Sequence, residues 1–372
     1  MKTARYLDDL PPYTPIEPVE VLSARLGLPP EQIVKLDANE NPFGMSPRAS
    51  QALKALGDAH LYPDPESRAM RRALADFCAM PMEQLMAGAG ADELIDLLLR
   101  VMIEPGDAVL TLPPCFGMYA FDARLNAARV VEVPRKEDFT LDIPAIQAAV
   151  RRCQPKVLLL AAPNNPDGGL LSEQEFEFLL KLPLLVVLDE AYIEFSGGGR
   201  LGEANSRIRQ VQQHNNLVVL RTFSKWAGLA GLRVGYGAFP TWLLSALWKA
   251  KQPYNVNAAA SSAAIASLED AELLSQRVAH IRQERQRLFA GLQRVPYLSS
   301  YPSEANFVLC RLKYGSARVL KDSLAQRGML VRYYDTPLLQ DCIRISVGLP
   351  VHTDRLLEVL SSLLPDAFSA ED

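Results

Sequence analysis

The side chain with the clearest potential for covalent chemistry is that of Lys225. It follows the apolar run 217–220 by a few residues, and Arg233 lies eight residues further on. A lysine amine is mostly protonated at neutral pH, but desolvation and a nearby cation such as Arg233 lower its pKa and favour Schiff-base formation. A lone lysine of this kind is usually a solvated loop residue. Gly228 and Gly231, which would let the backbone approach a ligand closely, help to make Lys225 a candidate nucleophile.

A carboxylate stands at the end of a second apolar run, 184–188, where Asp189 is followed three residues later by Tyr192. A carboxylate in such a place is costly to bury without a partner. A protonated pyridine nitrogen would be a suitable partner, because an ion pair in a low dielectric favours the charged forms. Asp189 could equally cap a helix or bind magnesium, so this segment alone leaves its role open.

An amide follows a third apolar run, Val157–Ala161, in the turn 162–169. Asn165 precedes Pro166 and is therefore kept away from helical backbone angles, which would fix its side chain at the strand end. From there the amide could donate a hydrogen bond to a phenolate oxygen. Asn-Pro and Asp-Gly pairs are also common in plain turns, so this segment too is open on its own.

Small residues at 87–91 lead into a predicted helix with apolar residues on one face. Amides at the start of such a helix bind anions, so Gly90, Ala91 and Asp92 form a candidate phosphate cradle. Glu93 stands where the GxGxxG dinucleotide motif has its third glycine, which disfavours a nucleotide-binding dehydrogenase. Asp92 and Glu93 could also be ordinary first-turn carboxylates.

The elements that must position these residues follow an alternating pattern. From about Leu36, apolar runs alternate with helical stretches, which predicts an α/β fold with a mostly parallel sheet covered by helices on both faces. Such sheets bind ligands at the carboxyl ends of their strands. After about Pro253 a long charged helix leads into a smaller α+β unit, with strands at 306–311 and 342–347. We expect an N-terminal arm with a short helix at 1–35, a large domain at 36–255 and a small domain at 256–372.

The composition is that of a soluble globular protein. Its 39 basic and 43 acidic side chains give a formal charge of −4, with 49% apolar and 22% charged residues, so no nucleic-acid-binding face is indicated. The apolar runs are shorter than the roughly 18 residues of a membrane span. No apolar signal core opens the chain, and we expect a cytoplasmic protein. Five scattered cysteines and four histidines argue against a disulfide framework and a metal site.

Taken in order along the chain, these segments resemble the fold-type-I pyridoxal-phosphate aminotransferases. A reactive lysine, a strand-end aspartate, an amide, a tyrosine and a phosphate cradle are the groups that this cofactor needs. The segments 36–44, 61–64, 113–119 and 342–348 are similar to the histidinol-phosphate aminotransferase family, and the likeness runs from about residue 12 to residue 348.

The resemblance implies pyridoxal 5'-phosphate as cofactor, with the Schiff base on Lys225, Asp189 beside the ring nitrogen, and Asn165 and Tyr192 at the phenolate oxygen. The other implied cofactor residues are Gly90, Ala91, Asp92, Thr222, Ser224 and Arg233 near the phosphate, Phe116 on the ring face, and Tyr62 from a neighbouring subunit. The resemblance therefore also implies a homodimer in which each active site contains residues of both subunits. Phe116 stands where relatives often have tyrosine, so the stacking is kept and a hydroxyl is lost. Asp167 stands where threonine is common.

The resemblance also places substrate recognition on Arg344 and Arg332, with Tyr13 of the N-terminal arm closing over the site. A guanidinium can bind a carboxylate or a phosphate. The implied reaction converts L-histidinol phosphate and 2-oxoglutarate into imidazole-acetol phosphate and L-glutamate, in histidine biosynthesis. The alternatives are an aromatic amino-acid aminotransferase, a phosphothreonine decarboxylase on the same scaffold, and an aminotransferase fold that serves only as a binding module.

Overall fold

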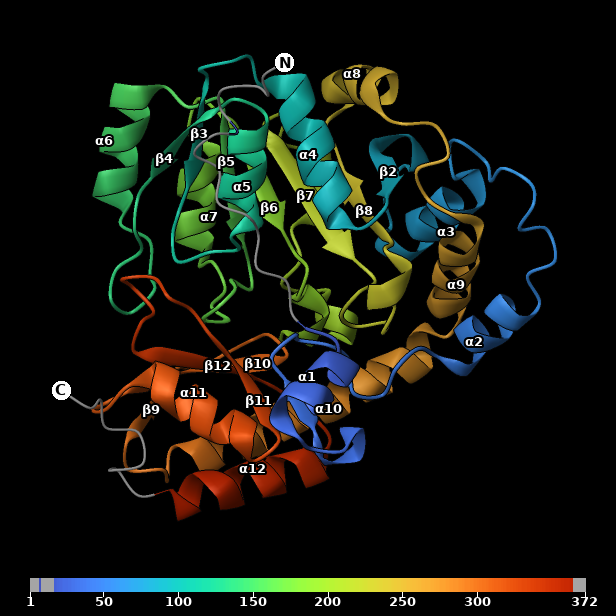
Figure 1. Cartoon of the computed structure of the whole chain (residues 1–372). Coiled ribbons are helices and arrows are strands. Elements are labelled where there is room, and N and C mark those ends of the chain that lie inside the picture. The colour runs from blue at the N-terminus through green and yellow to red at the C-terminus, as the bar shows by residue number, and fades with distance from the viewer. Residues whose placement is uncertain (1–6, 8–16, 364–372) are drawn as a thin grey trace, which may run out of the picture.

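The computed structural model, which describes residue 7 and residues 17–363, contains two sheets (Figure 1). The larger has seven strands in the order β2-β8-β7-β6-β5-β3-β4, and only β8 runs against its neighbours. Its strands are β2 (Leu85–Gly88), β3 (Ala108–Thr111), β4 (Arg129–Glu132), β5 (Val157–Ala161), β6 (Leu185–Asp189), β7 (Leu217–Thr222) and β8 (Gly235–Ala238). The predicted α/β fold with a mostly parallel sheet is therefore confirmed.

Helices cover both faces of this sheet, as the continuous apolar runs predict. Alternate residues of β5 enter different cores: Leu158 and Leu160 pack into one, and Val157 and Leu159 into the other, beside α4 and α8. The helices of this part are α2 (Pro47–Lys54), α3 (Arg68–Cys78), α4 (Ala91–Met102), α5 (Met118–Leu125), α6 (Ile143–Cys153), α7 (Glu173–Leu180), α8 (Thr241–Ala250) and α9 (Ala258–Glu269). Short 3-10 helices lie at Met82–Gln84, Ile193–Phe195, Arg200–Gly202, Ile208–Gln212 and Ala230–Leu232.

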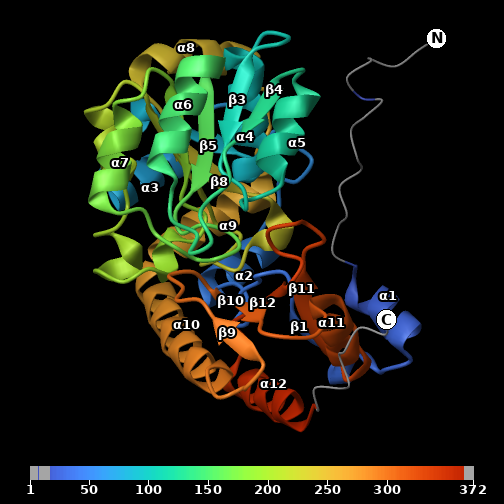
Figure 2. The same ribbon diagram turned by 90° about the vertical axis from the view of Figure 1, so that its left-hand side faces the viewer.

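The smaller sheet lies below the larger one in Figure 1 and has the order β1-β11-β12-β10-β9. Its strands are β1 (Val34–Leu36), β9 (Leu298–Ser300), β10 (Phe307–Leu312), β11 (Met329–Tyr333) and β12 (Cys342–Ser346). The helices of this part are α1 (Val19–Leu26), α10 (Ala271–Leu292), α11 (Ala317–Gln326) and α12 (Pro350–Ser362), with a 3-10 turn at Pro30–Gln32. The long helix α10 runs beside β9 and β10 (Figure 2), which agrees with the small α+β unit expected from the sequence.

Strand β1 ties the N-terminal segment to the C-terminal part of the chain. It pairs in parallel with β11, so that Leu36 lies opposite Val331. The predicted boundary between residues 35 and 36 falls inside this strand, and the domain limits remain a prediction. Within the described ranges, no helix combines the length and apolar character needed to cross a membrane.

Candidate active site

A cavity of about 140 Å³ lies where β5, β6 and β7 end. The residues that line it are Ala91, Asp92, Phe116, Tyr119, Ala161, Asn165, Asp189, Ala191, Tyr192, Thr222, Ser224, Lys225, Ala230 and Arg233. Most of the residues predicted to bind the cofactor are therefore brought together at one place. They meet because the carboxyl ends of parallel strands share one edge of a sheet. Gly90 lies next to the cavity as the residue preceding α4.

Lys225 lies a few residues beyond the end of β7, on the cavity wall. Its Nζ donates to the backbone oxygen of Ala38 over 3.3 Å and lies 5.8 Å from the ring centre of Tyr192. Burial lowers the pKa of Lys225 to about 8, and the guanidinium of Arg344 acts in the same direction. Arg233, the cation expected to do so, contributes less. A larger unprotonated fraction makes the amine more nucleophilic.

The two glycines after Lys225 do not serve the expected purpose. Gly228 has a φ of +69°, and a Cβ placed there would lie 2.5 Å from the backbone of Gly44. It therefore permits contact between two chain segments rather than close approach to a ligand. A Cβ at Gly231 would meet no atom within 4 Å, so this position has room for a side chain.

Asp189 is buried and held by two hydrogen bonds. Tyr119 donates its hydroxyl to Oδ2 over 2.7 Å, and the backbone N–H of Ala191 donates to Oδ1 over 2.9 Å. Burial raises the pKa of Asp189 to about 6, against the effect of these donors. Sequence reasoning missed Tyr119. Its position three residues after Phe116, in the segment 113–119, was the only available signal, because 70 residues separate it from Asp189.

The phosphate cradle predicted before α4 has a cation beside it. Arg233 Nη2 pairs with Asp92 Oδ2 over 2.7 Å, and a Cβ on Gly90 would lie 2.7 Å from the same nitrogen. Gly90 has a φ of +85°, which also favours glycine. Thr222 and Ser224 are buried, and the hydroxyl of Thr222 donates a hydrogen bond to that of Ser224 over 2.8 Å. Two hydroxyls, one guanidinium and the amides that start a helix are a suitable donor set for a phosphate.

Arg344 connects the smaller sheet to the cavity. Its Nη1 donates to Oδ1 of Asn165 and its Nη2 to the backbone oxygen of Asp37, each over 2.7 Å. Because Oδ1 of Asn165 faces Arg344, the NH₂ group is the end of this amide that remains for the cavity. Arg332 lies opposite Arg344 on the paired strands, and the guanidinium carbons of both lie within 6 Å of the ring centre of Tyr334.

Of the remaining predicted residues, Phe116 lines the cavity and Tyr62 lies apart from it. Tyr62 is 82% exposed and stacks on Tyr254, with ring centres 4.6 Å apart, so it does not line the cavity of its own chain. Phe116 is on the wall, with its ring edge-on to Tyr119. Burial raises the pKa of Cys115 to about 12, so this thiol stays protonated at neutral pH. Tyr13 lies outside the described residues.

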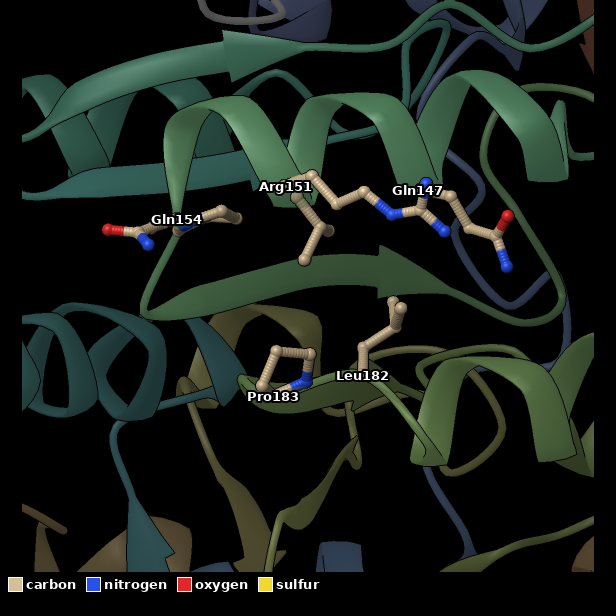
Figure 3. Close-up of a pocket in the computed structure, with 7 residues that line it drawn as sticks. Gln147, Arg151, Gln154, Leu182 and Pro183 are labelled. Atoms are coloured by element: carbon tan, nitrogen blue, oxygen red, sulfur yellow. The ribbon is translucent and has the colours of Figure 1, made fainter.

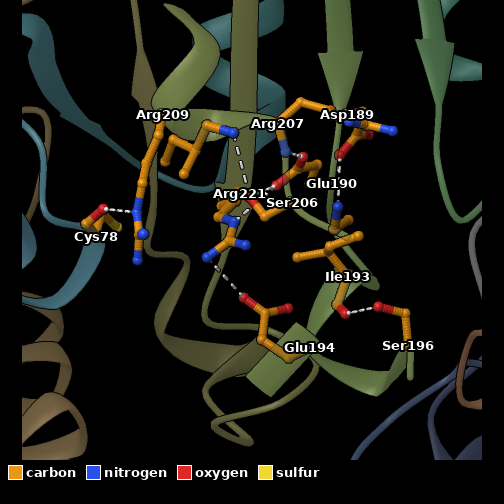
Figure 4. A network of polar contacts seen from close by, with 12 residues as sticks. Cys78, Asp189, Glu190, Ile193, Glu194, Ser196, Ser206, Arg207, Arg209 and Arg221 are labelled. Carbon is orange, nitrogen blue, oxygen red and sulfur yellow. Dashed lines mark hydrogen bonds and ion pairs between the residues drawn. The ribbon is translucent and has the colours of Figure 1, made fainter. Parts of the chain in front are cut away.

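A buried ionic network lies behind the site (Figure 4). Arg221 Nε donates to Glu190 Oε2 over 3.0 Å, and its Nη1 lies 3.8 Å from Oε1 of Glu194. Neither carboxylate oxygen of Glu194 has a hydrogen-bond partner in the described part of the chain, and burial raises the pKa of Glu194 to about 8. Glu190 follows Asp189 and Arg221 precedes Thr222 in the chain, so the network fixes the ends of β6 and β7 relative to one another.

A second hollow of about 440 Å³ opens at the amino ends of β5 and β6 (Figure 3). It is lined by Gln147, Val150, Arg151, Gln154, Pro155, Leu182 and Pro183. Its only charged residue is Arg151, which is exposed. The hollow has none of the buried reactive groups found at the carboxyl ends of the strands, and we assign it no chemistry.

Comparison with known proteins identifies the family. The model of the class I and II aminotransferases matches residues 31–362. A histidinol-phosphate aminotransferase of Roseiflexus castenholzii is 52% identical, over 95% of this chain and 96% of its own. The chain belongs to the histidinol-phosphate aminotransferases. A chloroplastic member from Nicotiana plumbaginifolia is 50% identical, over 95% of this chain and 85% of its own.

A solved structure supports the same assignment. The histidinol-phosphate aminotransferase of Sinorhizobium meliloti, in complex with pyridoxal-5'-phosphate, superposes with a TM-score of 0.86 at 29% identity. The match covers 99% of this chain and 97% of that one. This chain is thus a pyridoxal-phosphate-dependent transaminase, as the sequence predicted.

The cavity fits this cofactor on its own features. Asp189 is buried on the wall and has no ion-pair partner within the described residues, which suits a protonated ring nitrogen. Lys225 supplies an amine for the aldehyde, and the donors before α4 suit the phosphate. Phe116 supplies an aromatic face for the ring.

Proposed function

We propose that this enzyme transfers the amino group between L-histidinol phosphate and 2-oxoglutarate, giving imidazole-acetol phosphate and L-glutamate in histidine biosynthesis. One observation carries the proposal: the amine of Lys225, with its lowered pKa, and the carboxylate of Asp189 line one cavity together with Asn165, which accepts a hydrogen bond from the guanidinium of Arg344. Relatives with this activity are similar over nearly the whole chain.

The residues around the cofactor hold it and set its charge. When bound, pyridoxal phosphate supplies an aldehyde that accepts amino groups and a ring that withdraws electrons. Lys225 would hold the aldehyde and, when its amine is free, would take up and return a proton at the α-carbon of the substrate. Asp189 would keep the ring nitrogen protonated. Asn165 and Tyr192 would each donate a hydrogen bond to the phenolate oxygen.

The two arginines give the site its substrate range. A guanidinium presents parallel N–H donors that suit a carboxylate or a phosphate equally well. Arg344 and Arg332 lie opposite one another across β11 and β12, so both can face one anionic group. A transaminase needs this range because glutamate and a phosphorylated substrate use the same site in turn.

The assembly and location follow as further parts of the proposal. Tyr62 is exposed in its own chain, which agrees with a role at the cofactor phosphate of a partner subunit. We therefore propose a homodimer with shared active sites, in the cytoplasm. Tyr13, from the N-terminal arm, would close over the substrate.

The test follows the cofactor absorbance of the purified holoenzyme while L-glutamate and then imidazole-acetol phosphate are added. We expect the first addition to change the spectrum and the second to restore it, with release of L-histidinol phosphate. A higher kcat/KM for phenylalanine than for histidinol phosphate would instead indicate an aromatic aminotransferase. Carbon dioxide release from phosphothreonine without an acceptor would indicate a decarboxylase.

A variant tests the assignment of the lysine. Lys225→Ala should abolish turnover and leave the circular dichroism spectrum unchanged, because no other amine lines the cavity among the described residues. Near-normal turnover in this variant would refute the assignment.

A further inference from the structure

Asn39 lies at the centre of a buried group of hydrogen bonds between the cavity and the smaller sheet. It is 1% exposed, and its Nδ2 donates to the hydroxyl of Tyr192 over 3.0 Å. On its other side it contacts Ser346 of β12 twice: its backbone N–H donates to Oγ over 2.9 Å, and this hydroxyl donates to Oδ1 over 2.8 Å. Asn306 donates to the backbone oxygen of Asn39 over 3.0 Å.

The donors and acceptors of this group fix which end of the Asn39 amide faces Tyr192. A backbone N–H can only donate, so Ser346 Oγ is an acceptor in that bond and its own proton is left for Oδ1 of Asn39. The reversed amide would offer Ser346 a second N–H and leave the serine proton without an acceptor in a buried place, which is unfavourable. The NH₂ end of Asn39 therefore faces Tyr192.

This orientation leaves the proton of Tyr192 for another acceptor. The tyrosine oxygen already accepts from Asn39, so its own O–H is not used in that bond. The ring of Tyr192 packs edge-on against Phe307, with centres 5.1 Å apart, and the side chain of Phe307 has no oxygen or nitrogen that could accept a hydrogen bond. Tyr192 also lines the cavity, with Lys225 Nζ 5.8 Å from its ring centre, so the cavity is where the proton can be donated.

We propose that Asn39 is a positioning residue that turns the Tyr192 hydroxyl proton into the cavity, toward the phenolate oxygen of the bound cofactor. The inference rests on the proposed function, because it takes Tyr192 as a donor to that oxygen. Ser346 lies two residues after Arg344 on β12, so one strand carries both the substrate arginine and the hydroxyl that orients Asn39.

The test is a pH titration of the cofactor absorbance in the holoenzyme. A donor to the phenolate oxygen favours the more negatively charged form of the chromophore, which is the form present at high pH. Loss of that donor should therefore raise the pH at the midpoint of the titration. We expect Tyr192→Phe to raise it by about 1–2 pH units, since a hydrogen bond to a charged acceptor contributes on that order. Asn39→Ala should raise it by about 0.5–1 pH unit.

Two comparisons distinguish the loss of the Asn39–Tyr192 hydrogen bond from a general loosening of the buried group of hydrogen bonds. Asn306→Ala removes an equally buried amide from the same group without touching the bond to Tyr192, and should leave the midpoint unchanged. In a Tyr192→Phe background, Asn39→Ala should cause no further shift. Asn39 has a φ of +54°, which glycine adopts without strain, so Asn39→Gly repeats the measurement if the alanine variant does not fold.

The outcomes distinguish this inference from the proposed function. It is refuted if Tyr192→Phe moves the midpoint while Asn39→Ala and Asn39→Gly do not. It is also refuted if Asn306→Ala moves the midpoint as much as Asn39→Ala, or if the effect of Asn39→Ala persists without the tyrosine hydroxyl. A wild-type protein that forms no cofactor absorbance band would refute the proposed function itself, and the inference with it.

Discussion

Replacement of Tyr119 by phenylalanine should weaken cofactor binding without touching any atom expected to contact the cofactor. The variant removes the 2.7 Å hydrogen bond to Oδ2 of Asp189 and leaves the ring in place. A bond of this kind to a charged acceptor contributes about 1.5–3 kcal/mol, or roughly 1–2 pH units. The pKa of Asp189, already raised by burial to about 6, should rise by that amount.

The consequence is a change in the charge that meets the ring nitrogen. At pH 7 a carboxyl group with a pKa near 6 is mostly ionised, whereas one with a pKa of about 7–8 is half or mostly neutral. A neutral Asp189 cannot form the ion pair, so we expect the dissociation constant of pyridoxal phosphate to increase about two- to tenfold at pH 7, in proportion to the neutral fraction. The loss should become smaller as the pH is raised and Asp189 ionises again.

The assay is a spectroscopic titration of the apoenzyme with pyridoxal phosphate between pH 6 and pH 9. Tyr297→Phe is a matched control, because the Tyr297 hydroxyl also makes a buried 2.7 Å bond, but to the backbone of Leu360 in the smaller part of the chain. It should alter thermal stability alone. A Tyr119→Phe variant that binds the cofactor as tightly as the wild type does at pH 7 would show that Asp189 does not depend on this donor.

Three other predictions use features described above. Gly90→Ala should weaken cofactor binding at least about tenfold, because its Cβ would lie 2.7 Å from Arg233 Nη2; equal affinity in the titration would contradict the cradle. Arg344→Lys should raise KM for glutamate about tenfold or more and change kcat less, since an ammonium cannot form two parallel bonds; unchanged KM would count against the role. Glu194→Gln should flatten the pH dependence of unfolding. The folded carboxyl keeps its proton up to about pH 8, while the unfolded one loses it near 4.5, so the wild-type free energy of unfolding falls by roughly 5 kcal/mol as the pH rises between these values. A Glu194→Gln variant whose stability falls equally steeply would refute this.

Much of the fold could be predicted because buried parallel strands have a plain signature. β5 coincides with the apolar run Val157–Ala161, and β6 and β7 differ from their predicted runs by one or two residues. The residues that the structure adds to the ends of these strands are Asp189 in β6 and the pair Arg221 and Thr222 in β7, all of them polar. Their burial depends on partners from elsewhere in the chain, and hydrophobicity alone could not indicate it.

The parts of the site that sequence reasoning missed depend on contacts between distant segments. Tyr119 meets Asp189 across 70 residues and Asn39 meets Tyr192 across 153. Neither pair has a spacing that a local pattern could show. The same holds for β1, whose short segment gives no sign that its partner strand lies near residue 330. The residues predicted from local patterns, such as Lys225, Asp189 and Asn165, share one short motif with a strand end, whereas Tyr62, Arg332 and Arg344 were predicted from the family resemblance.

The bonds of Arg344 bear on how the enzyme selects its substrates. Each terminal nitrogen of Arg344 already donates to a neutral oxygen, of Asn165 or of Asp37, before any ligand arrives, whereas the buried Nε has no hydrogen-bond partner within the described residues. Binding through these two bonds is an exchange of acceptors, in which an incoming anion replaces neutral oxygens that are already well placed. A neutral compound of the same shape gains nothing from that exchange, and discrimination at this position rests on charge more than on fit.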